Sequence, residues 1–255
     1  MKYALLLHVD SSFEARPGAP EWDAAIGAHT AFQNRLKELD REPVGAALRD
    51  VSSATTLRVR DGERLVTDGP FAETAEQLWG FYVVEADDEA QALEFAGLTY
   101  EAQHGTVEVR PVIEMEDDCP STPSDDPALM RYVVLLYAPA DVDQGPDSEV
   151  WQAAMPAHVA LGEKLGQLGY DRGGAPLAPP EAAKSLRVRD GQPLVTDGPF
   201  AETKEALWGY YEVGAPDLDT VLDLFEGLWE AEHGSIEVRP CVFDASVMAA
   251  DVDRA

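Results

Sequence analysis

The sequence has few of the features that mark membrane, secreted or metal-binding proteins. It contains no apolar run near the roughly 18 residues that cross a bilayer, and we predict a strand and no export signal in its first 20 residues. Its two cysteines, Cys119 and Cys241, do not correspond between the repeated halves of the chain, so they indicate neither a disulfide framework nor a metal site. We expect a cytoplasmic protein that makes no membrane contact.

Positive charge is also scarce. Lys and Arg number 19 against 48 Asp and Glu, which gives a formal net charge of −29. Such a chain repels phosphate backbones, so we predict no nucleic-acid partner. The acidity is typical of a highly solvated surface, although an acidic binding face would give the same composition. The chain has no glycine-rich phosphate loop, no Cys/His cluster with zinc spacing and no Gly-x-Ser-x-Gly elbow, so we predict no metal and no cofactor.

The sequence is a tandem duplication of one unit. Sliding it by 129 positions aligns residues 1–115 with 130–244 without a gap, so that "EWDAAIGAHTAF" meets "VWQAAMPAHVAL". The intervening "EMEDDCPSTPSDDPAL" is rich in Pro, Ser and Asp, as flexible linkers are. We therefore predict a first unit at 1–115, an acidic linker at 116–129, a second unit at 130–246 and a tail at 247–255.

The similarity of the two copies is uneven. From Leu57 to Thr74, 16 of 18 positions are identical, and the ten letters "LVTDGPFAET" at 65–74 recur unchanged at 194–203. This indicates a restraint on the stretch beyond that of core packing. A local gene-conversion event would leave the same unevenness.

Each unit shows the pattern β-α-β-β-α-β. An apolar strand begins the unit, and a helix from Trp22 carries apolar residues at helical spacing. Asp61-Gly62 tolerates the positive φ angles of a tight turn, so it predicts a hairpin. A second helix and an alternating strand, with Val107 and Val109 on one face, close the unit.

Two helices on one face of an antiparallel sheet leave the other face uncovered. The second unit can supply the cover. We therefore predict an α+β protein of two tandem ferredoxin-like (βαββαβ) units that pack sheet to sheet as an intrachain pseudo-dimer.

Four of the five histidines occur as matched pairs. His29 lies on the apolar stripe of the first helix, and His158 takes the same place in the second unit, so both imidazoles should face a sheet. A histidine near a carboxylate is suited to proton transfer, whereas a core histidine bonded to backbone would give the same pattern. His104 and His233 each precede a glycine, where a helix C-cap explains them.

The repeated loop leaves one carboxylate without its usual partner. Asp68 would bond the backbone N–H two residues later, but that residue is Pro70, which has no N–H. Its carboxylate either bonds the amide of Phe71 or Glu73, or points outward as an acceptor. Asp197 repeats this arrangement in the second unit.

Three more matched pairs could line a site. The arginines could clamp an anion or form structural ion pairs, the glutamates are acids near the loop, and the tryptophans could line a pocket or fill the core. The predicted substrate-binding residues are Arg58, Glu73, Trp79, Arg187, Glu202 and Trp208.

Both halves resemble the YCII-related proteins, specifically the DGPF-domain branch. The motifs that carry the resemblance are "TDGPFAET", then "GFYVV" or "GYYEV", then "VEVRPV" or "IEVRPC". The resemblance implies the dimeric α+β barrel class, with the dimer fused here into one chain. It also implies a His–Asp pair in a cleft between helix and sheet, here His29 with Asp68 and His158 with Asp197. Genes for DGPF proteins often lie beside those for extracytoplasmic-function sigma factors, which implies an accessory role.

Two functions follow from these observations. The first is a small-molecule enzyme of lyase or isomerase type, in which His29 and His158 act as general bases and Asp68 and Asp197 orient them. The alternative is a non-catalytic ligand-binding or regulatory protein whose rigid loop presents carboxylates and backbone. Both imply a small-molecule ligand and an intrachain pseudo-dimer, and both are compatible with a further homo-oligomer.

Overall fold

A computed structural model describes residues 1–10, 20–71, 76–115, 123–124, 126–201 and 203–244. The first unit runs β1 (Lys2–Asp10), α1 (Pro20–Glu38), β2 (Val44–Leu48), a 3₁₀ turn (Val51–Ser53), β3 (Thr55–Arg60), β4 (Glu63–Asp68), β5 (Glu76–Glu85), α2 (Glu89–Ala96), α3 (Tyr100–His104) and β6 (Gly105–Pro111).

The second unit repeats this order. It runs β7 (Met130–Pro139), α4 (Glu149–Leu168), β8 (Asp171–Pro176), a 3₁₀ turn (Pro180–Ala182), β9 (Lys184–Arg189), β10 (Gln192–Asp197), β11 (Glu205–Ala215), α5 (Leu218–Phe225), α6 (Trp229–His233) and β12 (Ser235–Asp244).

Local sequence explains where the helices begin and end. Asp88 accepts a hydrogen bond from the Gln91 amide at 2.9 Å and so caps α2, and Asp217 does the same for α5. His104 Nδ1 donates to the Tyr100 carbonyl at 3.0 Å, which confirms the predicted C-cap, and His233 matches it.

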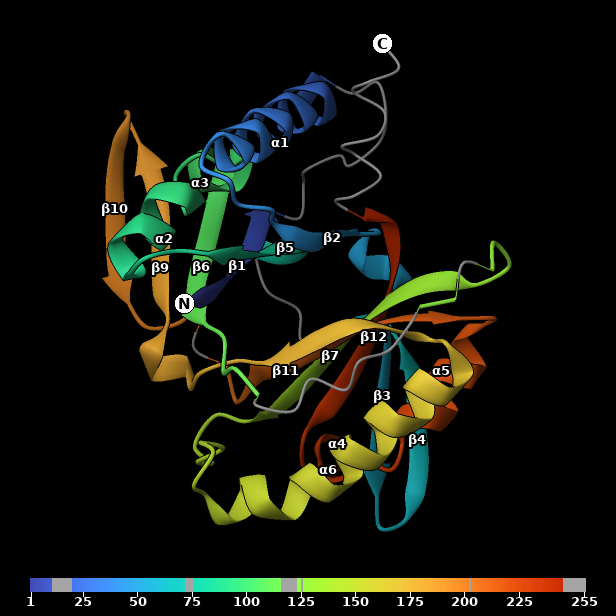
Figure 1. The fold of residues 1–255 in the computed structure, drawn as a ribbon. Coiled ribbons are helices and arrows are strands. Elements are labelled where there is room, and N and C mark those ends of the chain that lie inside the picture. The colour runs from blue at the N-terminus through green and yellow to red at the C-terminus, as the bar shows by residue number, and fades with distance from the viewer. Residues whose placement is uncertain (11–19, 72–75, 116–122, 125, 202, 245–255) are drawn as a thin grey trace.

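Eight strands form the predicted pseudo-dimeric α+β barrel. The order of neighbours is β6-β1-β5-β2-β12-β7-β11-β8, so the contact of β2 with β12 joins the two units on one side. The other side is closed by an antiparallel bridge between Val112 and Leu177. In Figure 1, α1, α2 and α3 lie outside one sheet and α4, α5 and α6 lie outside the other.

The hairpins that carry the repeated loop exchange between the units. β3 pairs with β12, so Leu57 lies opposite Ile236, and β9 pairs with β6, so Leu186 lies opposite Val107. Figure 1 shows the orange β9–β10 hairpin beside the helices of the first unit and the β3–β4 hairpin beside those of the second. The exchange is a tertiary feature that the sequence analysis did not foresee.

The exchange also corrects the strand assignment. β5 pairs with β1 on one side and β11 with β7, and on their other sides they pair with β2 and β8, two strands that the sequence analysis missed. Both are short, and β8 reads Asp-Arg-Gly-Gly-Ala-Pro, a composition that gives little strand signal. The hairpin is therefore an insertion in the ferredoxin-like unit. Its tight turn is confirmed, because Asp61 and Gly62 have φ angles of 53° and 77°.

Strand alternation separates the cores. On β1, Leu5 and Leu7 pack under the helices of the first unit, whereas Ala4 and Leu6 belong to the cluster inside the barrel. A third cluster, which includes Val134 of β7, lies under the helices of the second unit. Among the described residues, no helix combines the length and the apolar character that crossing a membrane requires.

Candidate functional site in the barrel

The closing strand of each unit turns charged residues into the barrel. Val107 and Val109 of β6 pack under the helices, so Glu108 and Arg110 point the other way, where the second sheet covers them. They are 3% and 2% exposed. The pair matched to them, Glu237 and Arg239 on β12, is buried just as deeply.

The buried arginines bind carboxylates and backbone carbonyls. Arg110 donates to Glu108 and to the carbonyl of Leu207. Arg239 donates to the carbonyls of Leu78, at 2.5 Å, and Arg49. Its guanidinium lies 3.9 Å from Glu237. Burial raises the pKa of Glu237 and lowers that of Arg239, since removal from water disfavours both charges.

The repeated loop of each unit donates a hydrogen bond to the buried glutamate of the other unit. The amide of Phe71 donates to Glu237 at 3.2 Å, and the amide of Phe200 donates to Glu108 at 3.1 Å. Gly69 has a φ of 96°, a conformation that only glycine adopts readily, and Thr56 donates to its carbonyl at 2.8 Å. The loop thus carries its phenylalanine amide to the carboxylate of the opposite unit.

Each loop phenylalanine also stacks on the first strand of the opposite unit. The ring centroids of Phe71 and Tyr137 are 3.8 Å apart, and those of Phe200 and His8 are 3.9 Å apart. A cavity of about 90 Å³ lies between these stacks. Its lining includes both stacks and both Glu–Arg pairs. Because a cavity of about 150 Å³ holds benzene, this one suits a ligand smaller than an aromatic ring.

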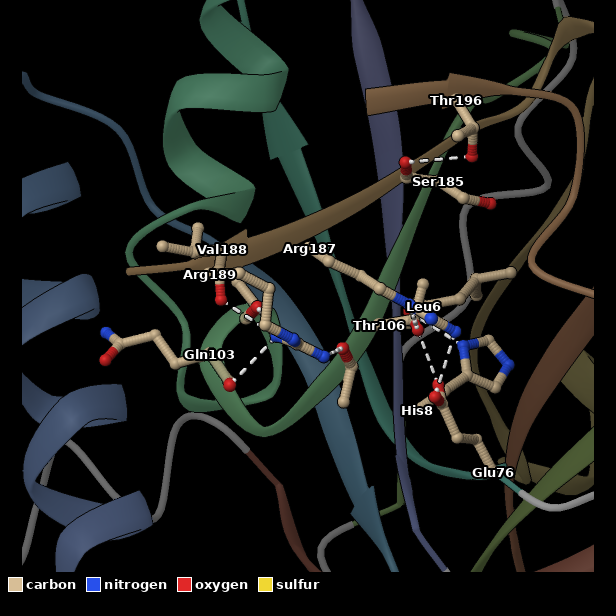
Figure 2. A network of polar contacts seen from close by, with 12 residues as sticks. Leu6, His8, Glu76, Gln103, Thr106, Ser185, Arg187, Val188, Arg189 and Thr196 are labelled. Atoms are coloured by element: carbon tan, nitrogen blue, oxygen red, sulfur yellow. Dashed lines mark hydrogen bonds and ion pairs between the residues drawn. The ribbon is translucent and has the colours of Figure 1, made fainter. Parts of the chain in front are cut away.

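His8, in the lining of the cavity, has one ring nitrogen fixed by a backbone carbonyl. Its Nδ1 lies 3.1 Å from the carbonyl of Leu6, as Figure 2 shows, and a carbonyl can only accept. Nδ1 therefore carries the proton and Nε2 presents a lone pair. Burial lowers the pKa of His8 to about 4, against an opposing effect of the negative charge on Glu108. The ring is neutral at neutral pH.

Tyr137, the counterpart of His8, supplies a donor. Burial, together with the negative charge of Glu237, raises the pKa of Tyr137 well above the ordinary value for tyrosine. Its hydroxyl therefore keeps its proton at neutral pH. The two matched positions, both in the lining of the cavity, thus carry a neutral imidazole and a neutral hydroxyl.

The predicted His29–Asp68 pair is not brought together. His29 Nε2 lies 3.2 Å from Glu101 on α3, and its Nδ1 lies 3.3 Å from the Tyr82 hydroxyl. Burial opposes protonation, but the charge and hydrogen bond of Glu101 outweigh it and raise the pKa of His29. Asp68 lies exposed on β4, which the exchange moves to the sheet of the second unit.

The second copy has the same arrangement. His158 bonds Glu230 at 3.3 Å and the Tyr211 hydroxyl at 2.8 Å. Asp197 instead accepts from Lys184 at 2.8 Å on the exposed hairpin. Each histidine is thus placed between its helix and its sheet, as the sequence predicted, but its carboxylate partner is a glutamate of the short third helix of its unit, α3 or α6.

None of the remaining predicted site residues that the structure describes is part of the cavity lining. Arg58 lies 3.9 Å from Glu205, a cavity residue, and Arg187 lies 3.0 Å from Glu76. Figure 2 shows that Arg187 also donates to Thr106. Trp79 and Trp208 are buried. Glu73 and Glu202 lie outside the described residues.

A second matched pair of arginines, Arg60 and Arg189, binds each exchanged hairpin to a helix of the opposite unit. Arg60 donates to the carbonyls of Ala231 and Glu232, both at 2.8 Å, at the C-terminal end of α6. Arg189 does the same at the end of α3, where Figure 2 shows its bond to the Gln103 carbonyl at 3.0 Å. A cation at this end of a helix is favoured by the helix dipole.

The sequence analysis missed the cavity residues His8, Tyr137, Phe71, Phe200 and the two Glu–Arg pairs. One signal was available, because "EVRP" recurs in both units and its alternation sets the Glu and Arg on one face. The unmatched His8 was the other. Among the described residues, no group of three or more His, Cys, Asp or Glu side chains is arranged to hold a metal ion.

Comparison with known proteins identifies the family. The model of the YCII-related domain matches residues 1–116 and again residues 130–243. This chain belongs to the YCII-related family. The tandem YCII-related protein is also 39% identical over 113 residues to the uncharacterized protein R00369 of Rhizobium meliloti (strain 1021), a match that covers 44% of this chain and 91% of that protein.

Two solved structures are similar to the whole YCII-related chain. A dye-decolorizing peroxidase from Bacteroides thetaiotaomicron VPI-5482 has a TM-score of 0.47 and 10% identity, with 98% of this chain and 94% of that chain covered. A mutant chlorite dismutase from Candidatus Nitrospira defluvii has a TM-score of 0.44 and 8% identity, with the same coverage.

Proposed function

We propose that this YCII-related protein is a small-molecule enzyme of isomerase or lyase type that works by general acid–base chemistry in the barrel cavity. The observation that carries the proposal is the pairing of a neutral His8, whose Nε2 is left as an acceptor by the bond of Nδ1 to Leu6, with a neutral Tyr137 in the lining of one cavity. The His29 and His158 clusters then hold helices on sheets.

The geometry supports proton transfer next to a carbonyl group. Nε2 of His8 would take the proton from the carbon beside the carbonyl, and the Tyr137 hydroxyl would donate to the carbonyl oxygen as negative charge builds there. A base with a pKa of about 4 removes only acidic protons, so a small 1,3-dicarbonyl compound suits this site.

A second candidate function is ligand binding without turnover. The same low pKa of His8 favours it, because an imidazole that stays uncharged at neutral pH keeps its unprotonated nitrogen as a hydrogen-bond acceptor and is a poor proton acceptor. The two candidates share the cavity and differ only in whether a proton leaves the ligand. One experiment therefore separates them.

The test replaces His8 with the residue that the second unit already carries at that place. We expect His8→Tyr to fold, because Tyr137 occupies the matched position on β7. Small dicarbonyl compounds that raise the melting temperature identify ligands, and NMR in D₂O measures exchange of their acidic protons. The variant should keep ligand binding and lose exchange by about 100-fold or more.

Tyr137→His is the matched control. It keeps the base and removes the donor, so exchange should fall while binding persists. If His8→Tyr exchanges protons at the wild-type rate, the enzyme proposal is wrong. If ligands bind to the wild type without any exchange, the protein is a binding protein.

A further inference from the structure

The outer strand of each exchanged hairpin is a sheet edge. Within the described residues, β4 pairs only with β3, and β10 pairs only with β9. All residues of both strands are exposed, including Leu65 and Val66 at 45% each. Exposed apolar residues on an edge strand favour pairing with another strand, and natural proteins usually block such edges.

Hairpin geometry fixes which backbone groups of β4 face outward. A two-residue turn is closed by a pair that exchanges both hydrogen bonds, here Arg60 and Glu63. Bonding then alternates along β4, and the Gly69 amide, which donates to the Ala54 carbonyl at 2.8 Å, keeps the same phase. The backbone groups of Arg64, Val66 and Asp68 therefore point away from β3.

The two edges differ where it matters for pairing. On β10, Pro193 stands in place of Arg64 and removes an outward N–H, and Lys184 binds the Asp197 carboxylate. On β4 the outward N–H of Arg64 is present. Thr55 stands in place of Lys184, and no ion pair is formed by Asp68 with any described residue. Among the described residues, the outer edge of β10 is therefore blocked against pairing with another strand, whereas that of β4 is not.

We propose that β4 pairs antiparallel with β4 of a second copy of this chain. A twofold axis at Val66 sets the outward groups of the two strands against each other, with Val66 opposite Val66. The same register places Arg64 opposite Asp68 of the second copy, and it does so twice. The edge is thus complementary to itself in hydrogen bonding, in apolar contact and in charge.

Two effects oppose this pairing. Arg64 already contacts Asp223 at 2.5 Å and Glu226 at 3.2 Å, but these acidic residues are exposed, and exposed ion pairs contribute little. The net charge of −29 on each copy opposes association. At physiological ionic strength the Debye length is about 8 Å, so mainly the charges beside the strands act.

Analytical ultracentrifugation of the full chain at physiological ionic strength tests the proposal. We expect a reversible dimer for the wild type and a monomer for Arg64→Pro. The fold tolerates proline at this position, because β10 carries Pro193 there. Asp197→Arg on β10 is the matched control and should leave the dimer unchanged.

Charge reversal provides a second arm. Asp68→Arg should weaken the dimer about tenfold, because it sets arginine against arginine across the strands. Arg64→Asp combined with Asp68→Arg should restore it. A wild type that stays monomeric up to the highest concentration measured overturns the proposal, as does a dimer that survives both Arg64→Pro and Asp68→Arg.

Discussion

The two halves of the barrel keep one architecture and differ in chemistry. The hairpin residues that contact the opposite unit are the same in both, from the loop phenylalanines to the arginines that bind the helix ends. The residues that face the cavity and the sheet edge differ, because His8 is matched by Tyr137 and Arg64 by Pro193. The two units have therefore diverged at the cavity and at the sheet edge, while the hairpin residues that join the copies are the same.

The comparison gives the loop phenylalanine of the repeated ten letters a structural role. Each loop serves the opposite unit, where its phenylalanine amide binds a buried carboxylate and its ring covers the cavity. A substitution in one loop therefore damages the core of the other unit. This restraint acts on both copies and exceeds ordinary core packing.

The largest expected effect concerns the buried Glu–Arg pairs. Arg110→Met and Arg239→Met should each lower the free energy of unfolding by about 3 to 5 kcal/mol, because each leaves a buried carboxylate without its cation. Arg35→Met, in an exposed pair with Glu38 at 3.0 Å, is the control and should cost less than about 1 kcal/mol. Denaturant titration measures all three. Unequal losses in the free energy of unfolding at the two buried sites would show that the two Glu–Arg pairs are not equivalent.

The next largest effect is a pH dependence of the free energy of unfolding that comes from His8, a histidine that only the first unit carries. The unfolded imidazole of His8 takes up a proton near its ordinary pKa of about 6.5, and the folded one only near 4. Between these values the unfolded chain binds more protons, so the free energy of unfolding falls on acidification, by up to about 3 kcal/mol.

His8→Tyr isolates this contribution from those of the carboxylates. The difference between the variant and the wild type should change between pH 7 and pH 4.5, with the wild type losing more stability. Denaturation midpoints at the two pH values measure it. Parallel losses would show that water reaches His8 and that its pKa is ordinary.

The smallest effect concerns the capping arginines. Arg60→Ala should cost about 1 to 2 kcal/mol, because charged hydrogen bonds to the end of α6 are lost. Arg189 is more exposed, so Arg189→Ala should cost less than about 1 kcal/mol. Thermal unfolding of the two variants compares them. A larger loss for Arg189→Ala would reverse the order expected from burial.

Much of the local structure could be predicted. Asp61-Gly62 specified the tight turn, Asp88 specified the start of α2, and alternation separated Val107 from Glu108. The site could not, because His29 and Asp68 lie on segments whose relation depends on where the hairpin docks. Glu101, the actual partner of His29, lies 72 residues along the chain and carries no local signal.

By itself, the sequence determined the duplication, the α+β units and the face that each side chain shares with its neighbours. Only the tertiary structure decided which faces meet water and which sheet receives each hairpin. A period of two groups Glu108 with Arg110, but their face becomes an interior only when the second sheet closes over it. The pattern of a hairpin is the same beside either sheet, so its exchange depends on contacts formed after the units meet.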